Sequence, residues 1–147
     1  MSPSTPSVYR SLLKDLALRV WWDLHPEAWQ SWKHLREIKD SQAGRKIVIL
    51  CNGPSLLKTD FEMLIDSGAY IIGLNKINLL FDKTDMRPDA IVAVNRHVIE
   101  QNAEFFNETD IPVYLSKIAI GRQKLVPKRK NITYLYPFEA YQRPTSD

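Results

Sequence analysis

The chain has 147 residues, of which 44% are hydrophobic and 25% are charged, and this is typical of a globular protein with one hydrophobic core. It is too apolar for a disordered chain, and no run of roughly 18 apolar residues predicts a membrane-spanning helix. The net charge of +3 is too small to indicate a nucleic-acid partner, and a single cysteine, Cys51, excludes an internal disulfide and a zinc site made of cysteines.

The N-terminal segment, residues 1–43, is expected to form a helical extension. Its first residues lack the charged and then apolar pattern of a secretion signal, so we expect a cytoplasmic protein. Between residues 8 and 39, apolar residues recur at helical spacing on either side of Pro26, which suits the first turn of the second helix. All four tryptophans lie in this helix pair: Trp21, Trp22, Trp29 and Trp32. We expect the pair to pack on the domain that follows; an oligomer or partner contact and adhesion to a membrane surface are the alternatives.

Residues 44–147 are expected to form an α/β domain, because short apolar runs alternate there with helical patterns. The runs that predict strands are residues 46–51, 70–74, 89–94, 112–115 and 132–136. Between the first two, Thr59 is the expected N-cap of a helix that ends at Gly68, and a helix after the third run reaches about Phe106. Strands and helices in this order predict right-handed crossovers and a parallel sheet.

Three asparagines end three successive predicted strands: Asn52, Asn75 and Asn95. Ligands of open parallel sheets bind at the carboxyl ends of the strands, near the switch in strand order. A carboxamide has both a donor and an acceptor, which suits ribose hydroxyls, a pyrimidine edge or phosphate oxygens. One asparagine after a strand is usually a turn residue, but three at the same edge make a binding site an equally good explanation.

The loop after the first strand, Asn52 to Ser55, adds three further candidates to this site. Gly53 allows the backbone to approach a ligand closely, Pro54 stiffens the loop, and Ser55 offers a hydroxyl beside amide groups that can face a phosphate. The alternative is a tight connection from strand to helix. The loop matches neither a P-loop nor a dinucleotide-binding fingerprint.

A basic segment near the C-terminus is the candidate for contacts with an anion. It contains six basic residues and no acid: Lys117, Arg122, Lys124, Lys128, Arg129 and Lys130. Lys117, Arg122 and Lys124 are the predicted phosphate contacts, and a solvated loop is the alternative.

Other candidates for chemistry are weaker. Asp82, Asp85 and Asp89 surround a loop and predict either a divalent-cation site or a solvated turn. The three histidines lack ligand spacing, so we expect no metal site made of histidines. His97 is a candidate acid or base, or else the start of a helix, and Cys51 is expected to be a packed thiol.

Three stretches carry a resemblance to a known family: Ile49 to Leu56 (ILCNGPSL), Gly73 to Phe81 (GLNKINLLF) and Arg87 to Asn95 (RPDAIVAVN). They resemble the 6-hydroxymethylpterin diphosphokinase MptE-like, or motility accessory factor-like, domain family. They are also similar to the related bacterial sialyltransferases that act on lipooligosaccharide. The resemblance covers roughly residues 40–147 and implies a Rossmann-like nucleotide-binding fold.

The resemblance also implies roles for the three asparagines. In the sialyltransferases, asparagines at the positions of Asn52, Asn75 and Asn95 contact the cytidine nucleotide of a CMP-sugar donor. Many pterin-kinase-like members have an acidic residue where this chain has Asn95, which favours the glycosyltransferase interpretation. The family continues with further donor contacts and, in the sialyltransferases, a catalytic histidine. Because the chain stops at Asp147, we expect an incomplete domain with no assigned catalytic base.

Three functions are therefore compatible with the sequence. The first is the nucleotide-sugar-binding part of a glycosyltransferase that uses a CMP-sugar donor and a carbohydrate acceptor. The second is a diphosphokinase that transfers pyrophosphate from ATP to a pterin with the help of Mg²⁺. The third is a non-catalytic nucleotide-binding or scaffolding module whose tryptophan-rich helices bind a partner.

Overall fold

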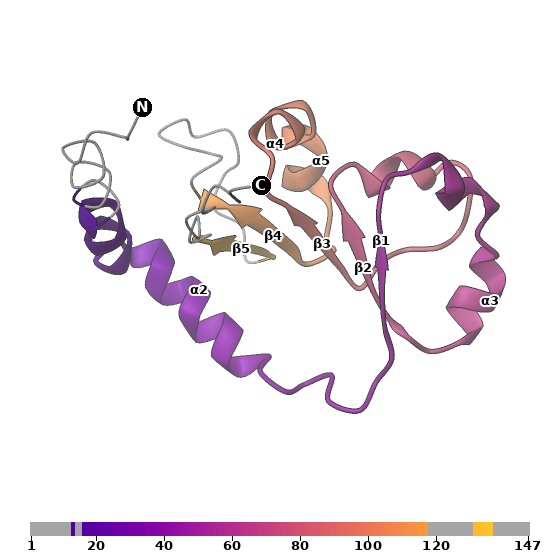
Figure 1. Cartoon of the computed structure of the whole chain (residues 1–147), viewed down its shortest axis with the longest axis horizontal. Coiled ribbons are helices and arrows are strands. Elements are labelled where there is room, and N and C mark those ends of the chain that lie inside the picture. Colours follow the sequence, from indigo (N-terminus) through magenta and orange to yellow (C-terminus); the bar gives the residue numbers. More distant parts are fainter. Residues whose placement is uncertain (1–12, 14–15, 118–130, 137–147) are drawn as a thin grey trace, which may run out of the picture.

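The computed structural model describes residue 13, residues 16–117 and residues 131–136 (Figure 1). The strands are β1 (Ile47–Leu50), β2 (Tyr70–Leu74), β3 (Ala90–Ala93), β4 (Val113–Ser116) and β5 (Ile132–Leu135). The helices are α2 (Pro26–Glu37), η1 (Pro54–Lys58), α3 (Phe61–Asp66), η2 (Ile77–Leu80), α4 (Arg96–Gln101) and α5 (Ala103–Glu108). Residues 16–23 are also helical.

The five strands form one parallel sheet, which confirms the predicted α/β, Rossmann-like fold with flanking helices. Each observed strand lies within one or two residues of its predicted run, because the apolar runs mark the buried segments. The strands are ordered β1-β2-β3-β4-β5, as in the chain. The described strands therefore have no switch in order.

One face of the sheet carries the hydrophobic core. A single row across all five strands is buried: Leu50, Gly73, Ile91, Val113 and Ile132. Right-handed crossovers between strands that follow the chain order all lie on the same face. The connecting segments accordingly supply further core side chains, among them Leu56, Ile77, Ile99 and Phe106.

The opposite face is covered at β4 and β5 and open at β1. Near the covered end, the hydroxyl of Tyr114 lies 3.4 Å from Nε2 of His34 in α2. At the other end, Ile47 and Ile49 are 54% and 58% exposed. Figure 1 shows α2 on the opposite side of β4 and β5 from α4 and α5. In the described residues, helices cover both faces of the sheet only near β4 and β5.

The N-terminal helices pack on β5. Oγ of Ser31 accepts the backbone N–H of Tyr134 at 3.1 Å, and the buried Trp22 ring stacks on Tyr136 with centroids 5.8 Å apart. The expected packing is confirmed for Trp22, but Trp21 and Trp29 are 50% and 66% exposed. None of the described helices has both the length and the apolar character needed to cross a bilayer.

The start of α3 differs from the prediction by one residue. The N-cap is Asp60, whose Oδ1 accepts the N–H of Met63 at 2.9 Å. The predicted cap, Thr59, instead closes η1, because its N–H donates to the carbonyl of Leu56. The end of the helix agrees with the prediction, since Gly68 adopts a positive φ of 64°. Adjacent threonine and aspartate both cap helices well, so the sequence alone could not separate them.

Candidate functional site

The three asparagines named above lie at one edge of the sheet. Asn75 directly follows β2, whereas Asn52 and Asn95 lie two residues beyond the last residues of β1 and β3. These three strands are parallel neighbours, so their carboxyl ends meet at the same edge. The structure therefore brings these three predicted residues to a common edge.

Asn75 occupies a sharp turn between β2 and η2. Its φ is +55°, a left-handed conformation that asparagine adopts more readily than most other residues. Its backbone N–H donates to the carbonyl of Val92 in β3 at 2.9 Å, which fixes the turn against the neighbouring strand. Its carboxamide makes no hydrogen bond with any described residue, so both of its polar groups are available.

Asn95 is the N-cap of α4. Its Oδ1 accepts the N–H groups of His97 at 2.9 Å and Val98 at 3.4 Å. The oxygen is thus used by the helix, while Nδ2 makes no hydrogen bond in the described part of the chain. The carboxamide of Asn95 is consequently set up to donate rather than to accept. This division between its two polar atoms could not be read from the sequence.

The loop after β1 is exposed and is anchored by the buried Leu56. Gly53 has an extended backbone with φ −125° and ψ 160°, which any residue can adopt. A Cβ atom at Gly53 would meet only Oγ of Ser55, at 3.7 Å. The folded chain thus does not itself require glycine here, and close approach of a ligand stays a prediction. The side chain of Asn52 makes no hydrogen bond with the described residues.

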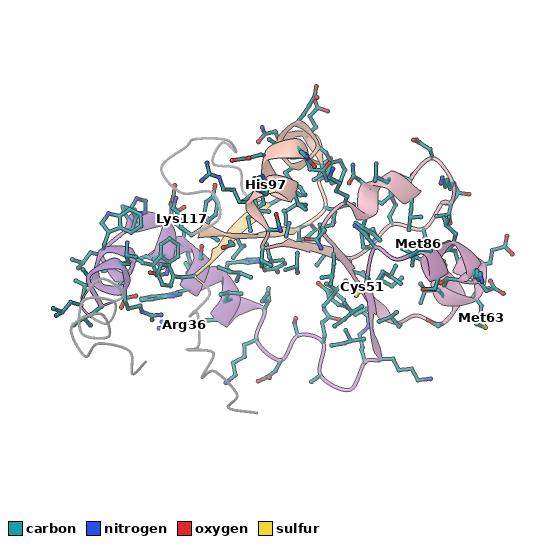
Figure 2. The ribbon with its side chains drawn as sticks, turned by 45° about the horizontal axis from the view of Figure 1, so that its top comes forward. Arg36, Cys51, Met63, Met86, His97 and Lys117 are labelled. Carbon is teal, nitrogen blue, oxygen red and sulfur yellow. The ribbon has the colours of Figure 1, made fainter. Side chains whose placement is uncertain are left out.

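Lys117 follows β4 but is engaged in a different contact. Its Nζ forms an ion pair with Oε2 of Glu27 in α2 and lies 4.8 Å from the centre of the Tyr134 ring. The side chains of Lys117 and Glu27 are only 13% and 10% exposed. The positive charge is therefore balanced within the protein, beside α2 (Figure 2). The other predicted phosphate contacts, Arg122 and Lys124, lie outside the described residues.

Tyr134 is part of the same contact. Burial raises the pKa of its phenol to about 12, and the carboxylate of Glu27 acts in the same direction. The phenol is therefore neutral at ordinary pH. Its ring offers Lys117 an aromatic face beneath the ammonium group.

The acidic loop has a structural explanation. Oδ2 of Asp89 accepts the backbone N–H of Ile71 at 2.7 Å, and Asp82 and Asp85 are exposed. Within the described ranges, no three histidine, cysteine, aspartate or glutamate residues lie close enough to hold a metal ion.

Two further sequence candidates have exposed side chains. The side chain of His97 is 83% exposed, and its Nδ1 lies 3.7 Å from Oε2 of Glu100 (Figure 2). Cys51 is also exposed, so the expectation of a packed thiol is wrong. It follows the buried Leu50 at the end of β1, where the second face of the sheet is open.

A polar pair beside the site was not predicted from the sequence. Nδ2 of Asn102, which is only 8% exposed, donates to Oδ1 of Asn78 at 2.8 Å. The sequence does contain a signal for this pair, because Asn102 lies at helical spacing between the apolar residues Ile99 and Phe106. This spacing places Asn102 on the buried side of the helix. A polar residue in such a position indicates a buried hydrogen bond.

Comparisons with known proteins found no matching family model, no matching curated protein and no matching solved structure. The resemblance described above consequently rests on the three sequence stretches alone. The fold and the geometry of the carboxyl edge are the observations on which a function can be built.

Proposed function

We propose that this chain binds a nucleotide or nucleotide sugar at the carboxyl edge of β1, β2 and β3. The observation that carries the proposal is that Asn52, Asn75 and Asn95 lie at this edge, and that the carboxamides of Asn52 and Asn75 and Nδ2 of Asn95 make no hydrogen bond with the described residues. Carboxyl ends of parallel strands are the usual ligand-binding positions of open α/β sheets.

The chemistry of this edge suits the neutral parts of a nucleotide. Asn52 and Asn75 each retain a donor and an acceptor, which match the edge of a base or a pair of ribose hydroxyls. Asn95 retains its donor, which suits a carbonyl, hydroxyl or phosphate oxygen. These groups recognise shape and hydrogen-bonding pattern without adding charge.

The reaction that we propose for this site is transfer of a sugar from a CMP-sugar donor. A base would remove the proton of an acceptor hydroxyl, the oxygen would attack the anomeric carbon, and the bond from that carbon to the CMP phosphate would break. The support is the resemblance of the asparagine-containing stretches to sialyltransferases and the presence of Asn95 where many pterin-kinase-like members have an acid. The base is unassigned.

The alternative reaction, pyrophosphate transfer from ATP, lacks a supporting observation. Magnesium would need the acidic loop, but Asp89 is bonded to the backbone of β2, and the described carboxylates do not form a metal site.

The test compares nucleotide affinity in variants that remove a carboxamide but keep the backbone geometry. Asn75→Gly retains a residue that tolerates positive φ, and Asn95→Ser retains an N-cap oxygen. Each should weaken CMP binding about tenfold in calorimetry, the loss of one net hydrogen bond to the ligand. Gln30→Ala, an exposed carboxamide in α2, is the control and should bind as the wild type does. Unchanged affinity in both asparagine variants would rule out the proposed site.

A further inference from the structure

Two side-chain hydrogen bonds join the segment after β2 to the helices after β3. Asn102 donates to Asn78 at 2.8 Å, and Nζ of Lys76 donates to Oε1 of Gln101 at 2.5 Å. The partners are 24 and 25 residues apart in sequence. The first bond is the better protected, because Asn102 is only 8% exposed whereas Gln101 is exposed.

On the β2 side, the hydrogen bond from Asn102 to Asn78 is attached to the turn that contains Asn75. Asn78 lies in η2, three residues after Asn75. The side chain of Ile77 packs directly on Gly73, so η2 folds back onto the end of its own strand. The N–H of Asn75 is held by the carbonyl of Val92. A displacement of Asn78 would therefore be transmitted to Asn75 through a short and well-packed segment.

On the β3 side, the bond acts on a single short helix. Asn95 caps the first turn of α4, and Asn102 ends the same helix by donating its backbone N–H to Val98. The N–H of Val98 is in turn one of the groups that Asn95 caps. Asn102 is thus connected to Asn95 by one continuous set of helical hydrogen bonds.

These contacts form a continuous path from Asn75 through η2, Asn78, Asn102 and α4 to Asn95. We propose that Asn78 and Asn102 are a positioning pair that sets the relative placement of the Asn75 and Asn95 carboxamides. The pair acts on the nucleotide through these two residues. This inference rests on the proposed function for its consequence in binding, but its mechanical part concerns the protein alone.

The binding test uses two substitutions of Asn78. Asn78→Leu keeps the branched shape of the side chain but removes the acceptor, whereas Asn78→Asp keeps an oxygen for Nδ2 of Asn102. Asn78→Leu should weaken CMP affinity about tenfold, and Asn78→Asp should stay within about twofold of the wild type. Glu104→Ala, an exposed substitution in α5, is the control. All affinities are compared under conditions in which urea titration shows each variant to be folded. Equal affinity of Asn78→Leu and the wild type would overturn the proposal.

A second measurement does not depend on any nucleotide. Hydrogen exchange in Asn78→Leu should be about tenfold faster than in the wild type at the amides of Asn75 and His97, which mark the two turns. The amide of Val113, bonded to Asn131 in the adjacent segment, should be unchanged. Unchanged exchange at Asn75 and His97 would overturn the pair as a positioning device. Wild-type protein that binds no CMP would contradict the proposed function, and the exchange rates would still decide whether the pair holds the two turns.

Discussion

At Gly73 the chain has no room for a side chain. A Cβ atom there would lie 2.6 Å from Cγ2 and 2.9 Å from Cγ1 of Ile77, which forms the turn beside the site. Gly73→Ala should therefore lower the free energy of unfolding by about 1–3 kcal/mol, measured by urea denaturation. Gly53→Ala is the matched control, because a Cβ at Gly53 meets only ordinary contact at 3.7 Å. Equal stability of the two variants would contradict this description of the turn.

Titration of Tyr134 should lower the stability of the fold at alkaline pH. Burial raises the pKa of its phenol from 10.0 to about 12, so the folded chain holds this proton more tightly than the unfolded chain does. The stabilising contribution is complete below about pH 10 and is lost as the pH rises towards about 12. Urea denaturation of the wild type and Tyr134→Phe across this range isolates the effect. The wild type should lose more stability than the variant; parallel pH profiles would contradict the prediction.

Among the contacts that attach α2 to the sheet is a buried hydrogen bond from Tyr134 to Ser31. Ser31→Ala removes the side-chain oxygen that accepts the Tyr134 N–H, and with it a buried hydrogen bond. The free energy of unfolding should fall by about 1–3 kcal/mol in urea denaturation. Gln30→Ala, at the neighbouring exposed position of the same helix, should change it little. Alanine favours a helix more than serine or glutamine does, so a similar loss in both variants could not come from helix propensity and would contradict a specific role for this hydrogen bond.

The strands were predictable because each is an apolar run that is buried on at least one face. The helix boundaries were harder to predict. Asn102 interrupts the predicted helix after β3 and divides it into α4 and α5, and the N-cap of α3 is Asp60 rather than Thr59. Such boundaries depend on which of several competent side chains reaches an N–H group, and this is decided by packing rather than by sequence pattern.

For the whole molecule, the two faces of the sheet should differ sharply in their tolerance of substitution. Ile91→Ala, on the fully buried face, should cost about 2–5 kcal/mol of unfolding free energy. Ile49→Ala, which is already 58% exposed on the other face, should cost less than about 1 kcal/mol. Urea denaturation of the two variants measures this difference directly. A large cost for Ile49→Ala would mean that the face at β1 is covered.

The position of the candidate site was predictable from topology, since neighbouring parallel strands must end at one edge. The chemistry of the site was only partly predictable from the sequence. The use of Asn95 Oδ1 by α4 and the pairing of Lys117 with Glu27, 90 residues away, follow from tertiary packing. The sequence pattern thus locates the edge, and the folded structure decides which polar groups at that edge are available to a ligand.

A nucleotide site at this edge can be tested by titrating isotope-labelled protein with CMP and following the NMR signals of its backbone and side-chain amides. The largest changes should fall on the amide groups of Asn52, Gly53, Asn75 and Asn95. Parallel titrations with UDP and with ATP plus magnesium decide the nucleotide class. Changes confined to other parts of the chain, or no change with any of these nucleotides, would contradict a nucleotide site at the carboxyl edge of β1, β2 and β3.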